Sequence, residues 1–218
     1  MVEKTGYSRC LDCGLVRIHA STTHDLDDYT RQYRSLFGSD LEVRINVNRV
    51  ATVMKFVETG KRVLDFGCSC GSFLARLEQY GYKCEGYEPS KIAPDNKTCV
   101  APIHTNTEDI EGKFDCITLF DVFEHLENPV EATHLLRSLL APGGHLIIIT
   151  PNPECREDLE NFYHLKPSEH AYLWSLGSLT KFMRGYELMY EYDDFSEGQI
   201  RRNAGSSDTL LAVVFIAS

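Results

Sequence analysis

The sequence has no long hydrophobic run: no apolar stretch in its 218 residues approaches the roughly 18 that a membrane span requires. Residues 1–7 also lack the apolar core of a secretion signal. These two absences predict a cytoplasmic protein that makes no membrane contact. In that compartment the eight cysteines are most simply reduced thiols rather than disulfides.

Basic residues are also scarce. The chain has 22 lysines and arginines against 32 aspartates and glutamates, which gives a net charge of −10. Proteins that bind the phosphate backbone of nucleic acids need a basic face. We therefore expect no general nucleic-acid binding.

Repeats, low-complexity tracts and clear linkers are absent as well, so a single compact domain is expected at this length. Residues 1–60 are expected to form an N-terminal hairpin and lid helices, and residues 61–218 the core of the domain. Across the core, apolar runs alternate with amphipathic stretches in the β-α-β order that is typical of a parallel sheet. The predicted strands lie at 62–66, 83–87, 114–120 and 145–150, and the predicted helices at 41–59, 72–80, after residue 89 and at 129–140.

The last part of the chain differs in character. A helix is predicted at 176–183, and residues 187–192 and 210–217 are β-rich. These two runs are predicted to pair antiparallel at the edge of the sheet. The predicted fold class is therefore α/β, with helices on both faces of a mostly parallel sheet.

The turn after the first core strand is rich in small residues. Gly67 and Gly71 stand in this turn, and the chain then passes directly into a helix, so backbone N–H groups and the positive end of the helix dipole meet at one point. The third glycine of a dinucleotide-binding loop is missing, which argues against NAD. Asp65 ends the first strand and Glu88 the second, where a carboxylate is placed to accept hydrogen bonds from ribose hydroxyls. A nucleoside without a pyrophosphate fits this pattern best.

With these residues the chain resembles the class I S-adenosylmethionine-dependent methyltransferases, whose first motif is D-x-G-x-G-x-G followed by an acid at the end of the second strand. Further segments are similar to one large branch of that family. The matching segments are 65–71, 87–89, 114–117 leading into 121–126, 140–144 and 150–152. The resemblance covers about 63–152 and implies a Rossmann-like, seven-stranded sheet, S-adenosylmethionine as cofactor, and methyl transfer to a small-molecule or sugar-type acceptor.

The resemblance also implies which residues hold the methionyl part of the cofactor. Gly67 and Gly71 would let the backbone approach it closely, with Cys68 in the same loop. Asp65 would lie on the side of the cofactor's ammonium group. The cofactor's carboxylate would take N–H groups near the start of the helix.

The nucleoside part is assigned to residues at the ends of the later strands. The resemblance implies that Glu88, followed by Pro89, holds the ribose and that Asp109 accepts a hydrogen bond from the adenine amino group. Phe120 and Asp121 would line the sulfonium side, at the carboxyl edge of the sheet where open α/β folds bind ligands.

The loop departs from the family motif at Ser69, which stands in place of the middle glycine. Its Cβ is expected to weaken cofactor binding or to shift the cofactor, unless the loop has room for a side chain this small. The same residue creates a G-x-S-x-G, which is the nucleophile elbow of α/β-hydrolases. Against a hydrolase, no oxyanion-type glycine cluster precedes the turn, and Asp65 and Glu88 would have no role. The alternatives are thus a hydrolase that uses Ser69 and a catalytically silent, methyltransferase-like binding module.

Two histidines are candidates for the chemistry. Methyl transfer from a sulfonium needs alignment, exclusion of water and, for an O–H or N–H acceptor, a base, but it does not require a metal. His125 follows the fourth core strand, at the edge where the methyl group would lie, and its neutral imidazole can take a proton near pH 7. A structural cap of the loop is an equal alternative for it, and Glu124 and Asp121 are equally read as solvated loop acids.

His170 ends a Pro-x-Glu-His segment that, in the branch this chain resembles, helps to close the acceptor pocket. Tyr163 and His164 in the same segment are further candidates for contacts with the acceptor. Simple aromatic packing is the alternative for all three. Whether the methyl group goes to oxygen, nitrogen or carbon is open.

Cys10 and Cys13 form a C-x-x-C, which is similar to half of the zinc ribbon found in relatives. Tetrahedral zinc needs four ligands, and His19 and His24 could complete the set. We expect a hairpin with free thiols and no metal, with bound zinc as the alternative. Residues 25–37 carry three aromatic side chains and are expected to form a lid helix over the cofactor.

Overall fold

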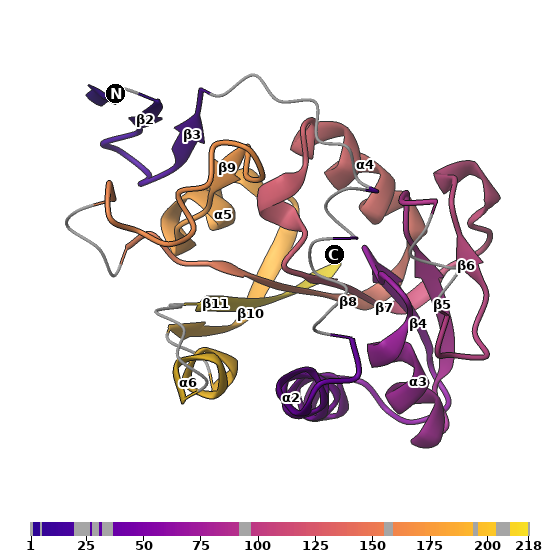
Figure 1. The fold of residues 1–218 in the computed structure, drawn as a ribbon. Coiled ribbons are helices and arrows are strands. Elements are labelled where there is room, and N and C mark those ends of the chain that lie inside the picture. Colours follow the sequence, from indigo (N-terminus) through magenta and orange to yellow (C-terminus); the bar gives the residue numbers. More distant parts are fainter. Residues whose placement is uncertain are drawn as a thin grey trace.

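The computed structural model describes residues 2–4, 6–19, 27, 31, 37–91, 97–154, 159–193, 196–203 and 210–217. Its centre is a seven-stranded sheet in the order β10-β11-β8-β7-β4-β5-β6 (Figure 1). The strands are β4 (Arg62–Phe66), β5 (Lys83–Tyr87), β6 (Ile103–His104), β7 (Phe114–Phe120), β8 (Leu140–Pro151), β10 (Tyr186–Asp193) and β11 (Leu210–Ala217). Strands β4 to β8 pair parallel, whereas β11 pairs antiparallel with both β8 and β10. The predicted fold class is confirmed.

The register of the central strands brings their carboxyl ends to one edge. Asp65 of β4 pairs with Thr118 of β7, and Phe66 pairs with Tyr87 of β5. The loops that follow β4, β5 and β7 therefore leave the sheet side by side. This edge is where an open α/β sheet binds its ligands.

Helices cover both faces of the sheet (Figure 1). Those on one face are α2 (Asp40–Phe56), α3 (Ser72–Gln79) and α6 (Ser196–Asn203), and those on the other are α4 (Pro129–Leu139) and α5 (Leu176–Phe182). Each face has its own apolar core: Leu74 of α3 belongs to the same cluster as Ile149, and Leu136 of α4 to the same cluster as Ile148. Neighbouring residues of β8 thus point to opposite cores, which explains why this strand reads as an unbroken apolar run.

Helix α2 begins one residue before its predicted start and ends earlier than predicted. The side chain of Ser39 caps it by accepting a hydrogen bond from the backbone N–H of Glu42 at 3.2 Å. Val57 already has an extended backbone, so the helix ends at residue 56 instead of 59. Gly60, with φ of +89°, turns the chain toward β4.

The junction between α4 and β8 also differs from the prediction. The helix ends at Leu139, and the strand begins at the next residue, five positions before the strand start predicted at residue 145. Phe114 pairs with the first residue of β8, whereas Cys116 pairs with His145. Residues 141–144 therefore form an irregularity inside the strand, where three positions of β7 (114–116) face six of β8 (140–145).

A second, smaller sheet has the order β1-β2-β3-β9. Its strands are β1 (Val2–Lys4), β2 (Tyr7–Arg9), β3 (Val16–Ile18) and β9 (Tyr172–Leu173). The N-terminal hairpin is thereby paired with a segment from beyond β8, and the backbone N–H of Ile18 donates to Ala171 O at 3.0 Å. This pairing connects the first residues of the chain to the segment that carries His170.

Parts of two predictions lie outside the described residues. Of the helix predicted after residue 89, residues 92–96 are not described, and 90–91 and 97–100 show no helix. Of the lid helix predicted at 25–37, only Asp27, Arg31 and Phe37 are described. Within the described ranges, no helix has the length and apolar character needed to cross a membrane.

Candidate active site

The loop between β4 and α3 turns on residues with a left-handed backbone. Gly67, Ser69 and Gly71 have φ angles of 86°, 50° and 78°. A Cβ added at Gly67 would lie 2.4 Å from a methyl carbon of Val122, and one added at Gly71 would lie 2.4 Å from the sulfur of Cys99. Both positions thus require glycine. Ser69 takes the same conformation with a side chain, at a cost of about 1 kcal/mol or more.

Glu88 stands just beyond β5 and holds this loop in place. Its Oε2 accepts a hydrogen bond from the backbone N–H of Ser69, and its Oε1 one from Ser90, both at 2.9 Å. Gly67 N–H donates to the carbonyl of Tyr87 at 2.7 Å, which closes the loop against the end of β5. Burial raises the pKa of Glu88, and the two backbone donors oppose that rise. The carboxylate is therefore fixed beside the loop, at the predicted ribose position.

The carboxyl group of Asp65 is buried at the start of the same loop. Its side chain is only 5% exposed, and its Oδ1 accepts a hydrogen bond from Thr118 Oγ1 at 2.7 Å. Burial raises the pKa of Asp65 to about 6, against the opposing effects of Thr118 and Arg49. A buried carboxylate of this kind gains most from a cationic ligand.

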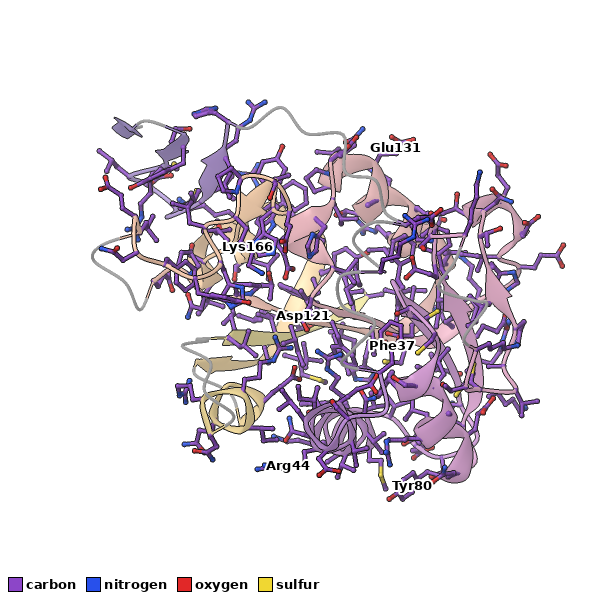
Figure 2. All side chains as sticks on the ribbon, in the orientation of Figure 1. Phe37, Arg44, Tyr80, Asp121, Glu131 and Lys166 are labelled. Atoms are coloured by element: carbon purple, nitrogen blue, oxygen red, sulfur yellow. The ribbon has the colours of Figure 1, made fainter. Side chains whose placement is uncertain are left out.

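Asp121 is held by arginines from two helices that the sequence did not associate with it. Its φ is 57°, and its Oδ2 lies 2.5 Å from Arg49 Nη2 of α2 and also pairs with Arg201 of α6. Glu197 lies 2.8 Å from Arg49 and pairs with Arg201 too. Although burial favours the neutral acid, the two guanidinium groups hold the pKa of Asp121 well below its usual range. Figure 2 shows Asp121 near the middle of the molecule. Its carboxylate is ion-paired with arginine, so the alternative of a solvated loop acid is wrong.

The remaining predicted cofactor residues differ in exposure. Cys68 is buried with its sulfur near Gly86, where an added Cβ would lie 2.4 Å from that sulfur, and the thiol also donates to the carbonyl oxygen of Ser69 at 3.7 Å. The ring of Phe120 is buried under Arg49, whose guanidinium carbon lies 4.8 Å from the ring centroid. Pro89 and Asp109 are exposed, the latter at the end of the 3-10 helix η3 (Thr107–Asp109).

The structure brings together the two histidines proposed for the chemistry. His125 ends the 3-10 helix η4 (Phe123–His125), and its ring centroid lies 4.7 Å from that of His170. Glu124 joins them and is buried at 1% exposure, so its alternative as a solvated loop acid is wrong. Burial raises the pKa of Glu124 to about 8 and lowers that of His170 to about 3. In the described part of the chain, this is the one group of three or more potential metal ligands.

The other aromatic candidates have different surroundings. His164 is buried and stacks on His170, with ring centroids 5.8 Å apart and planes 17° apart. Tyr163 is 53% exposed, and Lys166 Nζ lies 4.4 Å from its ring centroid. His164 is thus placed to position His170, whereas Tyr163 lies at the surface.

Cys10 and Cys13 lie in the connection between β2 and β3, and both are free, half-buried thiols. Among the described residues, no third histidine, cysteine or acid gathers with them to make a metal site. His24, proposed as a fourth ligand, lies outside the described residues.

A family model described as "Methyltransferase domain" matches residues 39–191 of the chain. The ubiquinone biosynthesis O-methyltransferase of Alkalilimnicola ehrlichii is 29% identical over 109 residues, which are 43% of this chain and 42% of that protein. The tRNA U34 carboxymethyltransferase of Dichelobacter nodosus is 32% identical over 107 residues, which are 44% of this chain and 34% of that protein. The chain thus spans less than half the length of these curated relatives.

Solved structures show the same fold. A chain from the complex between the Haloferax volcanii Trm112 methyltransferase activator and its methyltransferase superposes with a TM-score of 0.67 at 17% identity, over 90% of this chain and 99% of that one. The sheet order, the glycine loop beside an acid at the end of the next strand, and the match to the family model over most of the chain agree with one another. The chain belongs to the methyltransferase domain family.

Proposed function

We propose that the chain is an S-adenosylmethionine-dependent methyltransferase that acts on a hydroxyl group of a small-molecule or sugar-type acceptor. The observation that carries the proposal is the contact between Glu88 and Ser69, which holds a carboxylate beside the left-handed loop at the carboxyl edge of the sheet. The net charge of −10 and the O-methyltransferase relative favour a small hydroxyl-bearing acceptor over a nucleic acid.

The cofactor's groups match the groups around the loop. Glu88 already accepts one hydrogen bond on each oxygen, and each oxygen has a second lone pair for a ribose hydroxyl. The buried carboxylate of Asp65 suits the ammonium group of the methionyl part. Asp27, from the predicted lid, accepts hydrogen bonds from the side chain of Ser90 and the backbone of Lys91, both at 2.9 Å, which supports a lid over the ribose.

The reaction needs few groups from the protein. The acceptor oxygen forms a bond to the methyl carbon as the sulfur–methyl bond breaks, and the electron pair stays on sulfur, which loses its positive charge. The hydroxyl proton passes to a base or to water. His125, just beyond the end of β7, lies against His170, which comes from the segment before β9, and the two side chains can align the acceptor and exclude water.

The membership of the methyltransferase domain family removes the support for a hydrolase that uses Ser69. The backbone of Ser69 binds Glu88, which gives this residue a part in the loop that needs no nucleophile. A silent binding module would bind the cofactor without turnover. Transfer of a labelled methyl group to a panel of phenols, catechols and sugars separates it from an enzyme.

Titration calorimetry with S-adenosylhomocysteine tests the cofactor site. We expect saturable binding by the wild type and binding weaker by more than tenfold in Glu88→Ala, because charge-assisted hydrogen bonds to the ribose are lost. The exposed Glu111→Ala is the matched control and should bind like the wild type. No heat and no thermal shift at millimolar ligand, with the wild type folded, would overturn the proposal.

A further inference from the structure

Three side chains that could bind a metal converge in the interior, next to the proposed cofactor edge. Glu124, His125 and His170 each offer one ligand atom, and these atoms all lie within 4.8 Å of one another. Ligands around one ion at bond lengths of about 2.0–2.2 Å lie roughly 3–4 Å apart. Side-chain adjustments of about an ångström would therefore bring all three onto a common ion.

Both imidazoles are oriented by the backbone. His125 Nδ1 lies 2.8 Å from the carbonyl oxygen of Glu169, and His170 Nδ1 lies 2.7 Å from that of His164. A carbonyl oxygen only accepts hydrogen bonds, so each Nδ1 carries the proton and each Nε2 has the lone pair. This is the arrangement in which protein histidines bind metal ions, with the second nitrogen donating to a backbone carbonyl.

The third ligand is held in a similar way. Glu124 Oε2 accepts a hydrogen bond from Thr150 Oγ1 at 3.0 Å, and the carboxylate is 1% exposed. Over the ranges that the structure describes, Glu124 forms no salt bridge with a lysine or arginine. Arg201, whose charge acts on Glu124 from a greater distance, is already paired with Asp121 and Glu197. A buried carboxylate needs a nearby positive charge or a proton. An ion between the two imidazoles would supply that charge.

We infer that Glu124, His125 and His170 bind a divalent transition-metal ion. Two imidazoles and one carboxylate suit zinc, iron, cobalt or manganese, and they leave coordination positions open. Resting on the proposed function, the inference assigns those positions to the acceptor's hydroxyl group, which coordination acidifies so that it loses its proton to water more readily. In this arrangement His125 and His170 are ligands, and neither acts as the base.

Cobalt(II) uptake by the full chain without a histidine tag tests the inference. After removal of metal with a chelator, we expect the wild type to bind one Co²⁺ per chain, measured by elemental analysis and by visible absorption. Glu124→Gln keeps the acceptor for Thr150 and removes the charge, and His170→Asn keeps a donor for the carbonyl of His164. Both variants should bind Co²⁺ at least tenfold more weakly.

Two controls separate this site from others. His134 is exposed on α4, and His134→Asn should bind Co²⁺ like the wild type. Cys10→Ser removes one of the other two candidate ligands, Cys10 and Cys13, and should also leave uptake unchanged. No saturable uptake by folded wild type, or equal uptake by the wild type and both site variants, would overturn the inference.

The measurement needs neither cofactor nor acceptor, so it is independent of the test of the proposed function. Binding of Co²⁺ without binding of S-adenosylhomocysteine would support the metal site and contradict the proposed function. Binding of S-adenosylhomocysteine without binding of Co²⁺ would support the proposed function and contradict the metal site.

Discussion

At the scale of single residues, Asp65 shows how a proposed binding group lowers the stability of the protein that carries it. Its carboxyl group is buried, and its pKa rises from 3.8 to about 6 on folding. The folded chain therefore binds a proton between about pH 4 and 6 that the unfolded chain has released, so the free energy of unfolding falls as the pH rises through this window. A shift of about two pKa units corresponds to roughly 2–3 kcal/mol, lost in full above pH 6.

Asp65→Asn should therefore stabilise the free protein. The amide oxygen still accepts the hydrogen bond from Thr118, and the charge that burial disfavours is gone. We expect a gain of about 2 kcal/mol at pH 8 that shrinks toward zero at pH 4.5, measured by urea unfolding of both proteins at each pH. The same variant should bind S-adenosylhomocysteine more weakly, because the partner of its ammonium group is lost. An equal stability difference at the two pH values would contradict the raised pKa.

At the scale of elements, the strand-loop-helix unit β4–α3 depends on space as much as on backbone conformation. Gly60 and Gly67 flank β4 with nearly equal φ angles of 89° and 86°. A Cβ at Gly60 meets no atom within 4 Å, whereas one at Gly67 meets Val122 at 2.4 Å. The pair thus separates the cost of a left-handed backbone from the cost of a clash.

Gly60→Ala should lower the free energy of unfolding by about 1–2 kcal/mol, because only the left-handed backbone is disfavoured. Gly67→Ala should cost about 3 kcal/mol or more, because Val122 must move as well, and it should abolish binding of S-adenosylhomocysteine. Chemical denaturation and calorimetry measure the two effects. Equal losses of stability in the two variants would show that the contact with Val122 is relieved at little cost.

Most of the elements and part of the site could be predicted from the sequence, since both depend on local signals. Apolar runs and glycines place the parallel strands, and the acid after the second strand marks Glu88. Helix α6 was not predicted, because its residues are mostly polar. The pairing of Arg201 of this helix with Asp121, 80 positions apart in the chain, was therefore not predicted either. The contact between His125 and His170 depends on how two loops pack, which no local pattern encodes.

At the scale of the whole molecule, the N-terminal sheet supports the histidine segment. Val16 of β3 is fully buried and pairs with Leu173 of β9, and the neighbouring Ala171 accepts a hydrogen bond from Ile18. Ala171 N–H also donates to the carbonyl of Glu124 at 2.9 Å. The segment that leads into β9 thus contacts η4 at the residues next to the proposed metal ligands.

Val16→Ala should loosen this support. We expect a loss of about 1–2 kcal/mol in stability and faster amide hydrogen exchange over residues 169–174, with affinity for S-adenosylhomocysteine close to that of the wild type. Val47→Ala is the matched control, because Val47 is 54% exposed on α2. Exchange that stays at the wild-type rate over this segment would show that β9 is held without the N-terminal sheet.

The position of β11 has a consequence for how the chain is made. This strand follows β8 and β10 in sequence, yet it lies between them in the sheet. During synthesis, β8 therefore leaves the ribosome with the hydrogen-bonding groups of one edge unpaired. Strand β10 also emerges before β11, the strand that connects it to β8. Until β11 is translated, the nascent polypeptide offers that edge to other chains, and this interval is when a chaperone would protect it most from aggregation.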